Sequence, residues 1–391
     1  MLGRRLDRSF APEVRANVTA VTLGRLTGNA AYRFSGPFLG AIARGMHVTL
    51  GQIGVAVAVG ETSGLLSPLT GRLVDRLAPR RAMWWGLVGV AAGASAAGSA
   101  PNLVAFAAGL FLLGWAKSVY DIGLGAWIAG HVAYERRSRV VGLTETSWAL
   151  GLLVGVSLMG LITGVASPRW AYAAAAVVVV VMAGVLRHRL PEDHTAEARP
   201  VGVRIGRISR SGMVVVGGML LLAAGAQALF VTFGSWLQDQ HGFSSTTLAV
   251  VSFGLGAAEL AASLTSAHRT DAWGKERSVA VGAAAMVPAA LALAAAQRVL
   301  PLGLAAVVVA IVMFEFAIVS GIALASELVP GSAARGLAWV VSATTLGRAL
   351  VAIPATRLYQ HLGIDGPAVL TAVLAAGAVV AFARPARSRS T

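Results

Sequence analysis

Apolar residues come in twelve runs along the chain, separated by short polar or glycine- and proline-containing stretches. Each run holds roughly 18 to 25 residues, enough to cross about 30 Å of hydrocarbon as a helix rising 1.5 Å per residue. We therefore predict twelve membrane-spanning helices. They cover residues 18–43, 50–70, 82–99, 102–129, 140–164, 170–187, 212–237, 246–267, 278–297, 302–326, 334–358 and 365–384.

The sixth run, AYAAAAVVVVVMAGVL (171–186), is rich in valine and favours a strand by propensity. In lipid, an isolated strand leaves its backbone groups unpaired, whereas a helix satisfies them internally. We therefore predict a helix here as well.

Basic residues concentrate on one side of these spans. If the chain begins inside the cell, 24 of its 32 lysines and arginines fall in inner loops, four in outer loops and four within spans. This bias follows the positive-inside rule and predicts cytoplasmic termini. The net charge of +15 is therefore interpreted as loops facing an anionic inner leaflet, and nucleic acid is excluded as a partner.

Composition supports a membrane protein. Hydrophobic residues make up 56% of the 391 positions, with a mean hydropathy of +0.72, which is too apolar for a soluble chain of this length. Disulfides are excluded because there is no cysteine, and no cleavable signal peptide is evident before the first span. We expect a multi-pass protein of the inner (plasma) membrane.

A polar segment divides the spans six and six. We predict an N-terminal six-helix bundle over residues 1–187, a cytoplasmic linker over 188–211 and a C-terminal six-helix bundle over 212–391. A weak repeat supports duplication, because DAWGKERS (271–278) follows the eighth span as DRLAPRRA (75–82) follows the second. The glycine- and alanine-rich run GVAAGASAAGSA (89–100) indicates close helix packing.

The loop after the second span carries the most specific motif. GRLVDRLAPRR (71–81) approximates Gly-x-x-x-Asp-Arg-x-Gly-Arg-Arg through Gly71, Asp75, Arg76, Arg80 and Arg81. It departs in Leu77-Ala78-Pro79, which replaces the glycine and moves the paired arginines by one place. A degenerate second copy consists of Asp271, Gly274, Lys275 and Arg277. In these motifs and in its six-plus-six layout, the whole chain resembles the major facilitator superfamily.

This resemblance implies an all-α membrane protein with twelve transmembrane helices in two pseudo-symmetric six-helix bundles, the major facilitator fold. It further implies a transporter similar to drug or metabolite:proton antiporters. Lys117 stands near the place of a basic residue expected in helix 4. Helix 5 supplies the glycines of such antiporters, Gly151, Gly155 and Gly160, but has Val156 where proline is expected.

Nine ionisable side chains fall inside the spans, where each costs roughly 2.5 to 3.5 kcal/mol and needs a partner, water or a function. Spans three, six, nine and twelve carry none, as the resemblance implies for lipid-facing helices. We interpret the acids as proton-coupling candidates, with Glu61 and Asp121 first: Glu61, Asp121, Glu145, Glu259 and Glu315. Their charge partners are Arg25, Arg33, Lys117 and Arg348.

Depth along each span indicates which charges meet. Near the midplane we expect Arg33 with Glu61, and Glu315 with Arg348. Nearer the cytoplasm, similar depths group Arg25, Lys117, Asp121 and Glu145. For each pair the alternative is a structural ion pair that fixes helix packing.

Polar and aromatic side chains within the spans are candidates for substrate contact. They are Asn29, Tyr32, Arg33, Trp148, Gln227 and Phe314. The first three share one face of the first span. For membrane tryptophans the alternative role is that of an interfacial anchor.

We interpret the motif loops as a conformational gate made of Gly71, Asp75, Arg76, Arg80, Arg81, Asp271 and Arg277. Its arginines hold the turn at the anionic leaflet. We further predict that Asp75 forms a charge contact with a basic residue of the other half, such as one near Arg335. This contact is made only when the cytoplasmic side is closed.

Together these patterns favour a secondary transporter that works by alternating access. We predict a monomeric proton-coupled antiporter that exports a small organic compound. Proton-coupled or facilitated uptake of a metabolite and a non-transporting membrane sensor are the alternatives. The substrate's charge stays open, because the arginines suit an anion and the acids a cation.

No catalytic constellation or metal-ligand spacing occurs in the sequence, so we expect no enzyme activity, no metal and no cofactor beyond the proton gradient.

Overall fold

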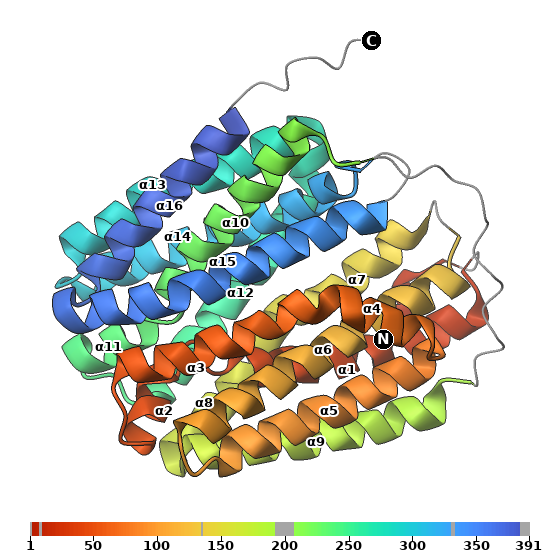
Figure 1. The fold of residues 1–391 in the computed structure, drawn as a ribbon, viewed down its shortest axis with the longest axis horizontal. Coiled ribbons are helices and arrows are strands. Elements are labelled where there is room, and N and C mark those ends of the chain that lie inside the picture. Colours follow the sequence, from red (N-terminus) through yellow and green to blue (C-terminus); the bar gives the residue numbers. More distant parts are fainter. Residues whose placement is uncertain (1, 8–9, 134–135, 192–206, 330–332, 384–391) are drawn as a thin grey trace. The chain divides into compact units, whose positions relative to one another are not determined.

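The computed structural model describes residues 2–7, 10–133, 136–191, 207–329 and 333–383. Within these ranges the chain is helical and contains no strand (Figure 1). Its first nine α-helices are α1 (Pro12–Arg33), α2 (Leu39–Gly45), α3 (Leu50–Thr62), α4 (Ser67–Asp75), α5 (Pro79–Ser99), α6 (Leu103–His131), α7 (Arg137–Leu150), α8 (Ser157–Val165) and α9 (Pro168–Arg189). The others are α10 (Arg210–Phe230), α11 (Phe233–His241), α12 (Ser245–Trp273), α13 (Lys275–Ala296), α14 (Leu300–Ala325), α15 (Ala333–Leu362) and α16 (Asp365–Ala383).

Each predicted span coincides with one helix or with consecutive helices, so the all-α membrane fold is confirmed. In the described ranges nine helices are long and apolar enough to cross a membrane, or ten if the bent pair Leu39–Gly45 and Leu50–Leu66 counts as one span. The predicted number of twelve is therefore not reproduced by length and hydropathy. Charged and polar residues dilute the apolar content of α1, and glycine and serine dilute that of α5.

The first predicted span, 18–43, is not one helix. α1 begins earlier, at Pro12, and ends at Arg33, and α2 begins only at Leu39 after a turn. Pro37 lies in this turn, and a proline cannot donate the backbone hydrogen bond that would continue the helix. The valine-rich sixth run is helical, as predicted, because it forms α9.

The chain divides into two compact units. Unit 1 consists of Met1–Met46, Leu66–Arg199 and Ser244–Ala257, and unit 2 of His47–Leu65, Pro200–Phe243 and Ala258–Thr391. Each unit thus draws on both halves of the sequence. The domain limits expected from sequence, 1–187, 188–211 and 212–391, stay a prediction, and residues 192–206 of the expected linker lie outside the described ranges.

In unit 1, α5 packs along α6 and α9 (Figure 1). Glycine makes the close approach of α5 to α6 possible: a Cβ atom on Gly93 would lie 2.5 Å from the backbone nitrogen of Leu113, and one on Gly86 2.7 Å from that of Tyr120. The close helix packing predicted for the run 89–100 is confirmed by this geometry.

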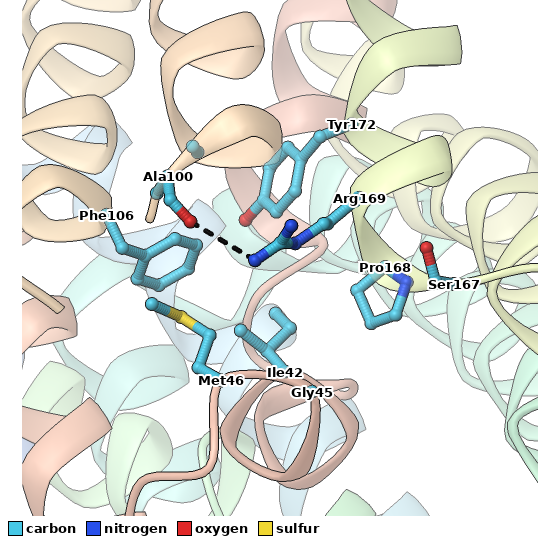
Figure 2. Close-up of a pocket in the computed structure, with 10 residues that line it drawn as sticks. Ile42, Gly45, Met46, Ala100, Phe106, Ser167, Pro168, Arg169 and Tyr172 are labelled. Carbon is cyan, nitrogen blue, oxygen red and sulfur yellow. Dashed lines mark hydrogen bonds between the residues drawn. The ribbon is translucent and has the colours of Figure 1, made fainter. Parts of the chain in front are cut away.

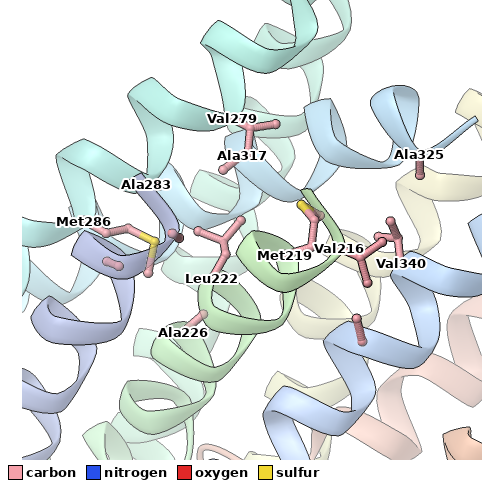
Figure 3. Packing of buried hydrophobic residues seen from close by; sticks show 13 residues of the cluster. Val216, Met219, Leu222, Ala226, Val279, Ala283, Met286, Ala317, Ala325 and Val340 are labelled. Atoms are coloured by element: carbon pink, nitrogen blue, oxygen red, sulfur yellow. The ribbon is translucent and has the colours of Figure 1, made fainter. Parts of the chain in front are cut away.

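Unit 2 is centred on a buried apolar cluster shared by α10, α13, α14, α15 and α16 (Figure 3). Met219 and Leu222 of α10 meet Val279 and Met286 of α13 there, and all four side chains are fully buried. The same unit holds α3 along α15. This packing fixes the helices that carry Glu61, Glu315 and Arg348.

Candidate functional site

A cluster of four charges joins α1, α6 and α7 in unit 1. Arg25 Nε lies 3.0 Å from Asp121 Oδ1, and Arg25 Nη1 lies 2.8 Å from Glu145 Oε1. Lys117 Nζ lies 2.5 Å from Asp121 Oδ2, one helical turn away on α6. These are the four residues expected to meet near the cytoplasm. Hereafter they are called the four-charge cluster.

Asp121 is the centre of this cluster, because each of its two oxygens contacts a different cation. The side chains of Arg25 and Lys117 are each 13% exposed, whereas that of Glu145 is 44% exposed. The Asp121 side chain is itself 27% exposed, so its charge is only partly solvated and depends on its partners. The cluster is therefore sensitive to any group that draws one cation away.

Aromatic rings flank the cluster. The Trp148 ring lies 4.4 Å from the Arg33 guanidinium and 5.6 Å from Lys117 Nζ, and Tyr32 also lies 5.6 Å from Lys117 Nζ. Arg33 Nη1 donates a hydrogen bond to the Trp148 backbone oxygen at 2.9 Å. Trp148 is thus held by cations inside the protein, which favours a site residue over an interfacial anchor.

Asn29 brings a polar group to the same region. Its Nδ2 donates to Ser147 Oγ at 3.2 Å, and Ser147 Oγ donates to the Thr144 carbonyl at 2.6 Å. The buried Oδ1 of Asn29 has no hydrogen-bond partner among the described residues. The structure therefore brings the expected contacts Asn29, Tyr32, Arg33 and Trp148 together. It adds Ser147 and Thr144, which no sequence pattern distinguishes from other hydroxyl residues.

A π-helical turn, Gly151–Val156, lies between α7 and α8 and begins three residues after Trp148. Ser157 Oγ donates to the Leu152 carbonyl at 3.2 Å in this turn. Gly155 lies so close to Ala30 that a Cβ atom there would overlap the alanine methyl group. Gly151 and Gly155 thus serve the approach of α1, whereas Gly160 lies against Phe38, and Val156 occupies the π turn. Such turns are frequent at functional sites.

A second ion pair lies in unit 2, where Arg348 Nε of α15 is 3.1 Å from Glu61 Oε2 of α3. The pairings expected from depth, Glu61 with Arg33 and Arg348 with Glu315, stay predictions. Distance along a helix fixes the height of a side chain but not the direction in which it points. Glu315 accepts a hydrogen bond from Ser263 Oγ at 2.6 Å. Glu259, 2% exposed, lies on the same helix as Ser263.

Two expected substrate contacts lie elsewhere in unit 2. Gln227 is 9% exposed on α10. Phe314 packs against the apolar cluster of Figure 3, so its side chain is surrounded by the core of unit 2. Their roles in binding stay predictions.

Of the gate residues, Gly71 lies in α4, Arg76 and Arg81 are exposed, and Arg80 Nη2 donates to the Arg187 carbonyl at 2.6 Å. Arg277 is also exposed, at the start of α13. The side chains of Asp75 and Asp271 lie outside the described part of the structure. The predicted closing contact of Asp75 therefore stays a prediction.

An apolar pocket with a volume of about 90 Å³ lies in unit 1, away from these charges (Figure 2). It lies between the ends of α2, α5 and α9, and Phe106 and Tyr172 line it. Arg169 Nη2 donates to the Ala100 carbonyl at 3.4 Å there. None of the predicted site residues lines it. Among the described residues, no three His, Asp or Glu side chains form a metal-binding group.

The fold and the site together indicate a class of protein. Several membrane-spanning helices with charges paired inside the spans are typical of membrane transporters. The chain belongs to the Major Facilitator Superfamily, whose family model matches residues 21–258. The resemblance inferred from the loop motif is thus confirmed at the level of the family, and the protein is a membrane transporter.

Two curated relatives are similar in sequence. The uncharacterized transporter y4wD of Sinorhizobium fredii is 25% identical over 308 residues, which cover 69% of this chain and 80% of that protein. The uncharacterized MFS-type transporter YwfA of Bacillus subtilis is 26% identical over 154 residues, 39% of this chain and only 37% of its own length.

Solved transporter structures share the fold over nearly the whole chain. The D-xylose–proton symporter has a TM-score of 0.75 at 15% identity, covering 95% of this chain and 97% of its own. A bacterial homologue of the human lysosomal transporter Spinster has a TM-score of 0.74 at 11% identity, with 95% and 94% covered. The human organic anion transporter MFSD10 has a TM-score of 0.66 at 20% identity, with 95% and 99% covered. At these identities the similarity concerns the fold alone.

Proposed function

We propose that the protein is a proton-coupled antiporter that exports a small organic compound, and that the four-charge cluster performs the coupling. The observation that supports this is Asp121, held between Arg25 and Lys117 beside the Trp148 ring. A proton-binding acid and a place for an organic ligand are thereby adjacent.

The coupling follows from the cost of buried charge. A donor group of the ligand can take the place of Lys117 or Arg25 at the Asp121 carboxylate, but only while that carboxylate carries no proton. A proton on Asp121 removes the charge that such a ligand group needs. Ligand and proton therefore exclude each other at this site, as antiport requires.

The substrate pocket would use the groups that face the cluster. Tyr32 and Trp148 offer aromatic surface, and the buried Asn29 Oδ1 accepts a hydrogen bond. A compact organic molecule with an apolar ring and one donor group suits this set.

Proton symport is a second candidate, and the pairing itself supports it. Both acids of the cluster already contact a cation, so a ligand carboxylate would compete with Asp121 for Lys117, and proton and anion would then bind together. The solved relatives include a D-xylose–proton symporter and an organic anion transporter, which share the fold.

We further propose that the protein is a monomer in the inner (plasma) membrane with both termini cytoplasmic, and that it uses the proton gradient without a cofactor. The distribution of basic residues supports this orientation.

The test is proton movement in proteoliposomes that contain a pH indicator, with ligands chosen by a thermal-shift screen. Under a ligand gradient, antiport moves protons against the ligand, and symport moves them with it. If no ligand moves protons and no proton gradient moves a ligand, the proposed coupling is wrong and the sensor alternative gains support.

Asp121→Asn tests the assigned residue. We expect it to abolish proton-driven flux while ligand exchange stays measurable. Glu327→Gln is the matched control, because Glu327 forms an ion pair with Lys275 but its side chain is 44% exposed. Loss of the monodisperse detergent peak in Asp121→Asn alone would instead indicate a structural ion pair.

A further inference from the structure

A triangle of three buried hydroxyl groups joins α12 and α14 in unit 2. Ser320 Oγ lies 2.9 Å from Ser266 Oγ and 2.8 Å from Thr270 Oγ1, and the latter two oxygens are 3.0 Å apart. Ser320, Ser266 and Thr270 are 0%, 1% and 5% exposed, respectively. A closed set of hydroxyls is costly to bury between helices unless each group is hydrogen-bonded.

The triangle has fewer protons than contacts. Ser320 Oγ also lies 2.9 Å from the Phe316 carbonyl, to which only its own proton can be donated. Two hydroxyl protons then remain for three oxygen–oxygen contacts. Several proton arrangements of similar energy are therefore available, and they interconvert by rotation of the hydroxyl groups. This is the property that a proton relay needs.

A metal ion is not needed to explain these contacts, because all three oxygens are neutral hydroxyls, whereas proteins bind Mg²⁺ through carboxylates. The oxygen–oxygen separations match O–H···O hydrogen bonds.

The triangle continues a polar stripe that begins at buried acids. Glu259, Ser263, Ser266 and Thr270 recur at i, i+4, i+7 and i+11, so they share one face of α12. Ser263 Oγ donates to Glu315 Oε1 of α14. The step from Ser263 to Ser266 is three residues, about 4.5 Å along the helix, a gap that one water molecule can bridge.

The other end of the stripe reaches the end of the helix. Thr270 lies three residues before Trp273, where α12 ends, and the basic residues Lys275 and Arg277 follow. The charge pattern predicts that this turn faces the cytoplasm. The stripe therefore leads from Glu315 to the side where protons would leave.

We propose that Ser263, Ser266, Thr270 and Ser320 relay protons between the buried carboxyl group of Glu315 and the cytoplasmic end of α12. The proposal rests on the proposed proton coupling and adds a path for it. In each step one hydroxyl gives its proton to the next oxygen and receives another from behind. One proton crosses, every hydroxyl is restored, and no electron is transferred.

A purely structural triangle would hold α12 to α14 without moving protons, and substitutions that keep the shape separate the two roles. Thr270→Val removes the hydroxyl at nearly constant volume, and Thr270→Ser keeps it. Thr265→Val is the matched control, because Thr265 is exposed on the same helix and donates only to the Ala261 carbonyl.

The readout is the infrared carboxyl band of Glu315 in the purified full-length protein, identified by its loss in Glu315→Gln and followed after a pH jump. We expect Thr270→Val and Ser266→Ala to slow its protonation by about tenfold or more, at unchanged final amplitude. Thr270→Ser, Ser266→Thr and Thr265→Val should keep the rate of the unsubstituted protein.

Protonation at an unchanged rate in Thr270→Val would overturn the relay, and so would a Glu315 band that never responds to pH. Both results are independent of the liposome assay. If the unsubstituted protein moves protons in liposomes but Thr270→Val shows no slowing, only the relay fails. If the band slows as expected but liposomes show no coupled flux, only the proposed transport fails.

Discussion

The pair Glu61 and Arg348 shows what a single buried charge requires. Glu61 is 8% exposed, and its ion pair joins α3 to α15 within unit 2. Removing Arg348 takes this ion pair from the buried Glu61, and removing Glu61 takes it from Arg348, whose side chain is 23% exposed, whereas replacing both leaves apolar side chains of similar volume. The pair is therefore suited to a double-mutant cycle.

We expect Glu61→Leu and Arg348→Leu each to destabilise the protein by about 2 kcal/mol or more. The double variant should recover most of that loss, because neither charge remains. Thermal unfolding in detergent measures the cycle. If the loss of stability in the double variant equals the sum of the losses in the two single variants, the two side chains do not depend on each other.

Charged residues within the spans can be identified from the sequence, but not all of their partners can. The four-charge cluster is predictable because Lys117 and Asp121 share a helix face, and because Arg25 and Glu145 lie at matching depth. The ion pair of Glu61 with Arg348 does not follow from depth, since a helix's rotation about its own axis is set by packing. The hydroxyls near Glu315 have no hydropathy signal that separates them from other serines.

At the scale of the elements, glycine determines how closely α1 packs against the helix formed by α7, the π turn and α8. Gly155 lies against Ala30 of α1, and Gly151 against Asn29. The sequence indicated these glycines through a family pattern, but not the π turn, because a change of hydrogen-bond register has no composition of its own. The end of α1 at Arg33 is not predictable from hydropathy for a different reason, because the apolar run continues past Pro37.

We predict that Gly155→Ala destabilises the protein by about 1–3 kcal/mol, because its methyl group overlaps that of Ala30. Gly142→Ala is the control in α7: it is exposed, no atom lies within 4 Å of the place its new methyl group would take, and higher helix propensity should stabilise by up to about 1 kcal/mol. Thermal unfolding in detergent compares them. If both substitutions stabilise, α1 does not approach this helix as described.

A second close approach joins α3 to α15, where a methyl group on Gly54 would overlap the Thr356 side chain. We expect Gly54→Ala to lower the unfolding temperature. The double variant Gly54→Ala with Thr356→Ala should restore part of the loss, because removing the threonine side-chain atoms makes room. A double variant that loses the sum of both single effects would argue against this contact.

For the molecule as a whole, hydropathy predicted the fold class and the approximate position of most helices, and the family model agrees with the motif loop. The two compact units take residues 47–65 and 244–257 from opposite halves of the sequence. Such spatial neighbours depend on long-range packing, which no local pattern encodes.

The orientation of the protein in the membrane can be tested by replacing each of two matched serines with cysteine. The chain has no cysteine of its own, so a thiol reagent labels only the introduced residue. Ser209 and Ser244 are both exposed, and each accepts a hydrogen bond at a helix N-terminus. We expect a membrane-impermeant maleimide to label Ser244→Cys in intact cells, and Ser209→Cys only after permeabilisation. The opposite labelling would reverse the predicted orientation.

The π turn between α7 and α8 also has a consequence for the length of this helix. A π turn accommodates one residue more than the α-helix it interrupts, so deleting one residue there would restore a regular helix. One residue corresponds to about 100° of rotation, and removing it would turn α8 relative to Glu145 and Trp148. The facing of this helix can thus be altered by a change in length, without any substitution of the side chains that meet the cluster.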